Sequence, residues 1–329
     1  MKNIVFLILV ITAQVAKGQN NEMLVDLNPH KLNLNFSEYD QSTAAFLGQV
    51  AELSYWKSED LKRLHTRMVK LYPDQNINYT LIYLPSTNTQ VVLWGCKNYL
   101  VISFRGTQFW KLKDWISDAK FWRYEFSNED AQKRYAGLPS GSAGARKAIM
   151  TLMDSNFFKT LNDQIIKSCG TLNKKLPVFV TGHSLGASLA QIFCVPLANL
   201  GYNYLGSYHF APPFTISHTD TAEMNRRYGA ITYNIVNYKD IVPRLRSVSK
   251  GRIGKFYRIC DDGDIYREKD ILFRFSLLRG LEVRKEFYYH SLGNHINAIK
   301  KNSNNNSLIK NRSEGRGDSP CMQPLIDSH

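Results

Sequence analysis

One pentapeptide limits what this chain can fold into more than any other feature. The sequence Gly-His-Ser-Leu-Gly at 182–186 directly follows the apolar run 176–181 and directly precedes the mostly apolar run 187–193. This order predicts a short buried strand, a tight turn and a helix. Glycines on both sides of Ser184 let the strand and the helix approach each other, and the turn holds the serine in a strained conformation at the top of an α/β sheet. The pattern therefore predicts Ser184 as a nucleophile.

A serine hydroxyl is a poor nucleophile at neutral pH, so it needs a histidine base and an acid that orients the base. On this scaffold the acid follows the serine in the chain and the histidine comes last. Residues 231–236 are β-branched and aromatic, which predicts a strand, and Pro243 stops further pairing shortly after it. Asp240 lies in the loop between them and is the predicted acid. The other downstream carboxylates are interpreted as a cap or as solvated turn residues: Asp220, Asp261, Asp262 and Asp264.

Two histidines compete for the role of base. Apolar residues recur at helical spacing over 292–299, and Ser291 is a suitable N-cap for that helix. His290 then lies in the loop before the helix, free to reach a strand end, whereas His295 lies inside the helix beside its apolar stripe. We predict His290 as the base, with His295 as the alternative. His183 is expected to point away from Ser184 and to support the turn by packing.

An acyl-transfer site also needs two donors for the oxyanion. The backbone N–H of Leu185, the residue after the nucleophile, is expected to be one of them. The other is suggested by the strand at 99–104, which runs into Arg105, Gly106 and Thr107.

With these residues the chain resembles the class 3 lipases, a family that includes fungal triacylglycerol lipases. Four segments carry the resemblance in order: 104–107, 182–186, 237–243 and 290–292 with its helix. The resemblance extends over most of the chain and implies an α/β-hydrolase fold: a single domain with a mostly parallel central sheet and helices on both faces. It implies the same triad, Ser184, Asp240 and His290, and an oxyanion hole formed by Thr107 and Leu185.

The segment after Thr107 has an amphipathic, aromatic pattern at helical spacing. In the resembled family this segment is the lid over the acyl groove, which turns its apolar face toward lipid at an interface. The predicted lid residues are Trp110, Leu112, Trp115 and Ile116. The alternative is an ordinary surface helix whose apolar side lies in the core.

The first residues are typical of a secretory signal peptide, with a short cationic start, an apolar stretch and small residues before position 19. We expect a signal peptide at 1–18, a class 3 lipase-like domain at 19–300 and a polar, disordered tail at 301–329. The protein would then be secreted, or periplasmic in a Gram-negative bacterium. No pair among the five cysteines has metal-ligand spacing, so no metal or other cofactor is predicted, and the disulfide pairing stays open. Cys194, on the helix after the turn, is expected to be buried.

The formal net charge is +14. No nucleic-acid-binding motif accompanies it, so no nucleic-acid partner is expected. A local excess of positive charge begins beside Asp240 and should therefore rim the active-site face, where it would attract anionic lipid. The alternative is a solvated basic loop. The basic residues in question are Lys239, Arg244, Arg246, Lys250, Arg252, Lys255 and Arg258.

The sequence thus predicts a secreted serine hydrolase that cleaves carboxylic ester bonds of glycerolipids through an acyl-enzyme, as triacylglycerol lipases do. Its partner is a lipid interface or an ester substrate, and no obligate protein partner is implied. The alternatives are a phospholipase A1, a feruloyl-type esterase, and a non-catalytic binding module that keeps the fold.

Overall fold

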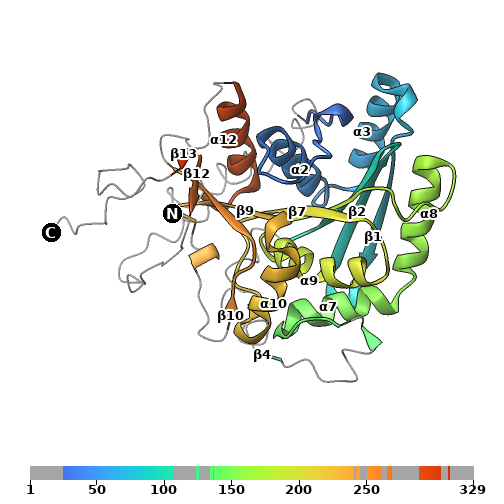
Figure 1. Ribbon diagram of the computed structural model, residues 1–329. Coiled ribbons are helices and arrows are strands. Elements are labelled where there is room, and N and C mark those ends of the chain that lie inside the picture. Colours follow the sequence, from blue (N-terminus) through green and yellow to red (C-terminus); the bar gives the residue numbers. More distant parts are fainter. Residues whose placement is uncertain are drawn as a thin grey trace, which may run out of the picture.

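The computed structural model describes residues 25–106, 124–125, 134–135, 137–240, 242–244, 250–260, 265–268, 289–304 and 310–311. Within them, strands form a sheet in the order β1-β2-β3-β6-β7-β9-β11-β12-β13 (Figure 1). Their bounds are β1 Asn78–Leu84, β2 Thr89–Cys96, β3 Tyr99–Phe104, β6 Val178–His183, β7 Tyr204–Phe210, β9 Thr232–Asn237, β11 Lys255–Ile259, β12 Ile265–Glu268 and β13 Lys310–Asn311.

The middle of the sheet is parallel. β3, β6, β7, β9 and β11 are parallel to one another, while β2 pairs antiparallel with β3 on one side and β12 pairs antiparallel with β11 on the other. β1 pairs antiparallel with β2. Because parallel strands end at the same edge, the residues after β3, β6, β7 and β9 meet there. The register shows it: Phe104 pairs with Gly182, and His183 pairs with Phe210. The predicted mostly parallel sheet is confirmed.

Helices cover both faces of this sheet (Figure 1). On one face lie α2 Gln41–Leu53, α3 Ser58–Leu71 and α12 Leu292–Asn304; on the other lie α7 Ala143–Asp154, α8 Phe157–Cys169, α9 Leu185–Asn199 and α10 His218–Tyr228. The strand sequences explain this arrangement. In β3, Leu100 and Ile102 pack into the core beneath α7, α8 and α9, whereas Tyr99 and Val101 pack into the core beneath α2 and α3. A strand that is buried on both faces is apolar throughout, and the runs seen in the sequence have that character.

Short elements complete the described part of the chain. A small sheet has the order β10-β8-β5-β4, with bounds Lys250–Gly251, Ile216–Ser217, Gly141–Ser142 and Tyr124–Glu125. The 3-10 turns are η2 Pro29–Lys31, η3 Pro73–Gln75, η4 Pro85–Thr87, η6 Gly229–Ile231 and η7 Val242–Arg244.

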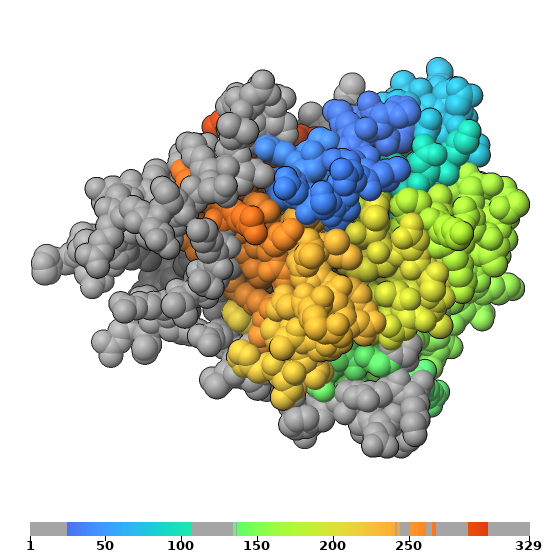
Figure 2. Space-filling view, in the orientation of Figure 1, coloured from blue at the N-terminus to red at the C-terminus, as the bar shows by residue number. Residues whose placement is uncertain are grey.

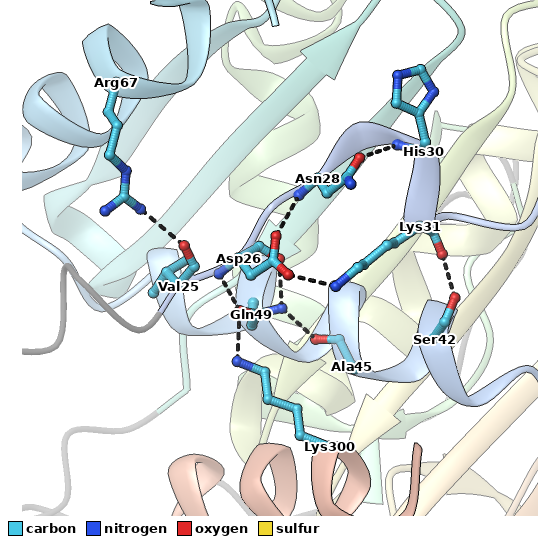
Figure 3. A network of polar contacts seen from close by, with 10 residues as sticks. All are labelled: Val25, Asp26, Asn28, His30, Lys31, Ser42, Ala45, Gln49, Arg67 and Lys300. Carbon is cyan, nitrogen blue, oxygen red and sulfur yellow. Dashed lines mark hydrogen bonds and ion pairs between the residues drawn. The ribbon is translucent and has the colours of Figure 1, made fainter. Parts of the chain in front are cut away.

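Helix α2 fastens α12 to the rest of the fold, and the segment before α2 joins the same network (Figure 3). The side chain of Gln49 in α2 accepts from the backbone N–H of Asp26 at 2.7 Å and from Nζ of Lys300 in α12 at 3.0 Å, and it donates to the carbonyl of Asp26 at 2.9 Å. Gln41 donates to the carbonyl of Ile299, also in α12, at 2.7 Å. In the space-filling view the blue amino-terminal part also lies against the orange part of the chain that contains β11 (Figure 2). Since α12 follows His290, these contacts set the position of that histidine.

None of the helices in the described part is long and apolar enough to cross a membrane. The proposed signal peptide lies outside the described residues, as does most of the tail, so the predicted domain boundaries stay predictions. Cys194 is buried as expected, and burial raises the pKa of its thiol to about 12. Cys96, Cys169 and Cys194 are reduced, whereas Cys260 is disulfide-bonded.

Candidate active site

The turn between β6 and α9 is a strained strand-to-helix elbow. Ser184 separates the last residue of β6 from the first residue of α9, with φ 57° and ψ −126°. Residues other than glycine rarely adopt such a backbone conformation. A Cβ on Gly182 would lie 2.5 Å from the Gly186 carbonyl, and a Cβ on Gly186 would lie 2.1 Å from the carbonyl oxygen of Phe104. Both glycines are therefore needed for α9 to pack against the sheet as closely as it does.

Ser184 is buried, yet its hydroxyl is unused. Among the residues that the structure describes, its Oγ has no hydrogen-bond partner. Its backbone is held in place, because its N–H donates to the carbonyl of Phe210 at 2.9 Å. Leu185 begins α9, and the first N–H groups of a helix have no carbonyl partner within it. These amides carry the positive end of the helix dipole and can stabilise an oxyanion.

Asp240 and His290 form a buried pair. Oδ2 of Asp240 lies 2.8 Å from Nδ1 of His290, and the two side chains are 0% and 3% exposed. The other carboxylate oxygen accepts from the N–H of Val242 at 2.9 Å, which fixes the acid loop. With the Nδ1 proton facing the carboxylate, the lone pair of Nε2 is left to act as a base. Nε2 of His290 is buried and has no partner among the described residues.

The structure separates the two candidate bases. His295 lies inside α12 and is buried; its Nδ1 donates to the carbonyl of Ser291 at 2.9 Å. Burial lowers the pKa of His295, so its imidazole stays neutral. His290, one residue before the N-cap position, is the histidine that contacts Asp240.

His183 does more than pack. Its ring centroid lies 4.7 Å from that of His290, and its two nitrogens form hydrogen bonds to Oη of Tyr55 and to the carbonyl oxygen of His290. Tyr55 was not among the sequence candidates. It lies 128 positions before His183, and no local pattern marks it.

The remaining sequence candidates divide into those that are described and those that are not. Asp220 lies in the first turn of α10, where its carboxylate accepts from the N–H of Ser140 at 2.5 Å, away from the buried histidines. The following candidates lie outside the described residues: Thr107, Trp110, Leu112, Trp115, Ile116, Asp261, Asp262 and Asp264. In the part of the chain that the structure describes, no three His, Cys, Asp or Glu side chains are grouped to hold a metal ion.

The expectation for the basic run after Asp240 is wrong for Lys255. Lys255 pairs with Tyr233 near the beginning of β9, and its Nζ lies 3.5 Å from the carbonyl of Ser37. That is the amino-terminal edge of the parallel strands, opposite Asp240. Arg258 pairs with Val236 near the carboxyl end of β9, so the run returns toward the edge that carries Asp240. The guanidinium of Arg252 lies 4.0 Å from the centroid of the Phe214 ring, in the segment that follows β7.

Comparisons with known proteins agree with this geometry. Residues 101–250 match the family described as Lipase (class 3), a range that includes Ser184 and Asp240. This region is similar to the class 3 lipase family. The triacylglycerol lipase OBL1 of Arabidopsis thaliana is 28% identical over 217 residues, which is 54% of this chain and 40% of that relative. The chain therefore spans less than half the length of the curated relative that it matches.

Several solved structures align with the same fold, and two of those described below are named as lipases. A mutant form of MDLA from Penicillium cyclopium aligns with a TM-score of 0.57 at 19% identity, covering 77% of this chain and 96% of that one. The triacylglyceride lipase of Rhizomucor miehei aligns with a TM-score of 0.52 at 19% identity, covering 67% and 80%. Lipase II from Rhizopus niveus aligns with a TM-score of 0.51 at 20% identity, covering 65% and 78%. At this level of identity they establish the fold, which is the α/β-hydrolase fold.

Proposed function

We propose that the protein is a serine hydrolase that cleaves carboxylic ester bonds of glycerolipids, as its relatives named as triacylglycerol lipases suggest. In the proposed reaction Ser184 attacks the acyl carbonyl while Nε2 of His290 takes the serine proton. Asp240 keeps the imidazole oriented and stabilises the imidazolium. The alcohol leaves with that proton, and an acyl-enzyme remains. Water activated by His290 then releases the fatty acid.

One observation carries the proposal. The buried contact of 2.8 Å between His290 and Asp240 comes with a serine elbow at φ 57°, and both reactive atoms, Oγ of Ser184 and Nε2 of His290, lack partners in the described part. Buried polar atoms without partners cost free energy, on the order of 1–3 kcal/mol each. In the proposed reaction both atoms must be free to react, which accounts for this cost at the nucleophile and the base.

A fluorophosphonate label tests this proposal directly, because it reacts only with an activated serine. Wild-type protein should be labelled and Ser184→Ala should not, while both unfold at similar temperatures. Ester hydrolysis by Ser184→Ala should fall by several orders of magnitude, because the triad acts as a unit. A variant that keeps a tenth of wild-type hydrolysis would disprove the nucleophile.

The substrate class within this chemistry is a finer part of the proposal. Phospholipase A1 and feruloyl-type esterase use the same triad, so the comparison of interest is turnover on tributyrin, long-chain triolein, phospholipid and a feruloyl ester. We expect preference for neutral glycerides. Absence of both labelling and turnover would favour the non-catalytic binding module.

For the oxyanion we propose the N–H of Leu185 together with Thr107, and for the lid we propose Trp110, Leu112, Trp115 and Ile116. Leu185 at the start of α9 supports the first. Gly106 supports Thr107 as the second donor. A Cβ on Gly106 would lie 3.2 Å from Cβ of Ser184, and Thr107 is the next residue in the chain. Thr107→Ala, which keeps the backbone donor, should cost less than Ser184→Ala.

We also propose that the protein is secreted, with cleavage after Gly18. The disulfide at Cys260 supports an oxidising compartment, because cytosolic thiols are kept reduced. Amino-terminal sequencing of protein collected from the medium should begin at Gln19, and retention of the protein inside the cell would overturn the proposal. We also propose that the protein is attracted to anionic lipid surfaces, as expected of an enzyme that works at a lipid interface. The net charge of +14 supports this proposal.

A further inference from the structure

A path of hydrogen bonds at the candidate site joins four separate segments. The N–H of Gly106, at the end of the segment after β3, donates to Oη of Tyr55 at 3.1 Å. That oxygen lies 3.0 Å from Nδ1 of His183, in the elbow. Nε2 of His183 lies 2.7 Å from the carbonyl oxygen of His290. Tyr55 itself follows α2, so the path passes through the helix layer that also carries α12.

The chemistry of the two ends fixes every proton along this path. A carbonyl oxygen only accepts, so Nε2 of His183 must carry the proton that faces His290. In a neutral imidazole Nδ1 is then an acceptor, and the hydroxyl of Tyr55 donates to it. The oxygen of Tyr55 keeps its lone pairs for the N–H of Gly106. Each donor has one acceptor and no proton is left over.

The path requires a neutral His183, and its surroundings provide that. Burial, together with the nearby His290 and His295, holds the pKa of His183 well below its usual range. A protonated ring would place a second donor against the Tyr55 hydroxyl, which already donates its own proton there.

The segments that the path joins are in close contact. A Cβ on Gly106 would lie 2.5 Å from Oη of Tyr55 and 2.4 Å from the carbonyl oxygen of His183. The backbone before Thr107 therefore lies directly against the elbow and the tyrosine. A displacement of Tyr55 would move the candidate oxyanion donor and the elbow together.

We propose that Tyr55 and His183 are positioning residues, which hold the segment before Thr107 and the backbone of His290 in register with Ser184. Neither residue touches the ester in this scheme; they act through the atoms that do. The inference rests on the proposed function, because it assigns a task to residues around the proposed nucleophile and base. Misplacement of reacting groups by about 1 Å can lower a rate on the order of a hundredfold.

The test replaces one hydroxyl and compares it with a matched hydroxyl elsewhere. Tyr55→Phe removes the hydroxyl and keeps the ring. Tyr208→Phe is the control. The hydroxyl of Tyr208 likewise makes two hydrogen bonds: it accepts from the N–H of Asp40 at 2.8 Å and donates to the carbonyl of Asp40 at 3.1 Å. Rates are expressed per serine labelled by fluorophosphonate, so that unfolded protein does not count.

Tyr55→Phe should lower kcat on a soluble ester about ten- to hundredfold with little change in KM. Tyr208→Phe should lower only the unfolding temperature. His183→Gln, which keeps a donor toward His290, should retain more activity than His183→Phe. Tyr55→Phe combined with His183→Phe should be no slower than His183→Phe alone, because both changes interrupt one path.

A readout independent of turnover is the tautomer of His183. In ¹⁵N-histidine-labelled protein the Nδ1 of His183 should be unprotonated at pH 7 and its resonance should move in Tyr55→Phe. The reverse tautomer, or full activity per labelled serine in Tyr55→Phe, would overturn this inference while leaving the proposed hydrolase intact. A wild type inert to both label and esters would instead overturn the proposed function, and this inference with it.

Discussion

Nδ1 of His290 lies 2.8 Å from Oδ2 of Asp240, in a contact that joins two loops fifty positions apart in the chain and excludes water from both side chains. The acid loop follows β9, and the histidine precedes α12. The sheet fixes the first loop and the contacts of α12 with α2 fix the second, so the pair is held from both sides of the molecule.

Asp240→Asn should keep the fold and lose the activity. An asparagine can still accept from the N–H of Val242, so the acid loop stays formed. Its amide, however, can present a donor to His290 and favour the wrong imidazole tautomer. Loss of this orientation costs about 10⁴-fold in kcat in the serine hydrolase that serves as the reference for such triads. Steady-state kinetics on a soluble short-chain ester, with circular dichroism to check folding, measures the effect. A loss smaller than tenfold would remove Asp240 from the mechanism.

The two histidines near the site should respond differently to truncation. His290→Ala should resemble Ser184→Ala, with hydrolysis reduced by several orders of magnitude and the fold retained. His295→Ala should mainly lower the free energy of unfolding, since His295 is fully buried in α12 and donates to Ser291. A folded but inactive His295 variant beside an active His290 variant would reverse the assignment of the base.

Ser184→Gly should be inactive but more stable than Ser184→Ala. The backbone at φ 57° and ψ −126° is strained for any residue with a Cβ, and glycine removes the strain. Such strain is of order 1–3 kcal/mol. Urea unfolding measures the free energy of unfolding of both variants, and since neither carries the serine hydroxyl, the difference reports the backbone strain. Equal stability would mean that the elbow stores no strain.

The local parts of this site were predictable, and the reasons are physical. The strand, elbow and helix around Ser184 follow from glycine spacing and apolar runs, which are properties of neighbouring residues. The same holds for Asp240 after β9 and for His290 before α12. Tyr55 was not predictable, because its contact with His183 depends on how α2 packs on the sheet. The expectation for Lys255 was wrong for a related reason: the chain crosses from one edge of the sheet to the other between Asp240 and Lys255, so closeness in sequence is not closeness in space.

Stability should decrease as the pH falls because of another buried histidine, His209. His209 in β7 lies 3.3 Å from Oδ1 of Asn234, and burial lowers its pKa to about 4. Between pH 6.5 and about 4 the unfolded chain binds a proton that the folded chain excludes, so the free energy of unfolding decreases as pH falls through this window and levels off below it. The shift corresponds to about 3 kcal/mol.

His209→Gln tests this assignment, since glutamine does not titrate. The variant should be less stable at pH 7 yet lose less stability on acidification. Urea unfolding at several pH values between 7 and 4 measures both slopes. Parallel curves for wild type and variant would show that His209 is not responsible.

The last prediction concerns the charge near the acid loop. If the protein is attracted to anionic lipid, hydrolysis of a neutral lipid should rise when anionic lipid is mixed into the vesicles. Each basic side chain near such a surface contributes about 1 kcal/mol, and salt at 0.1 M screens the attraction beyond about 10 Å. The gain should therefore shrink between low and high salt.

The structure changes which residues should be neutralised. Lys255 lies at the opposite edge of the sheet, and Arg252 packs on the ring of Phe214, so neither is a suitable residue to neutralise. Arg244→Gln with Arg246→Gln is the suitable pair, because both follow Asp240 closely in the chain. Lys62→Gln with Lys70→Gln is the matched control, since both are exposed on α3, which packs beside β1 at the far side of the sheet.

The arginine pair should lower the gain on anionic vesicles, and the lysine pair should leave most of it. Hydrolysis of a soluble ester must stay unchanged in both, because damage to the loop that holds Asp240 would slow that reaction as well. Removing two charges near the surface should weaken vesicle binding by about 2 kcal/mol, which is roughly thirtyfold in affinity. Equal losses in the two pairs would attribute the attraction to the net charge of the whole protein, and equal rates on neutral and anionic vesicles at low salt would show that no attraction exists.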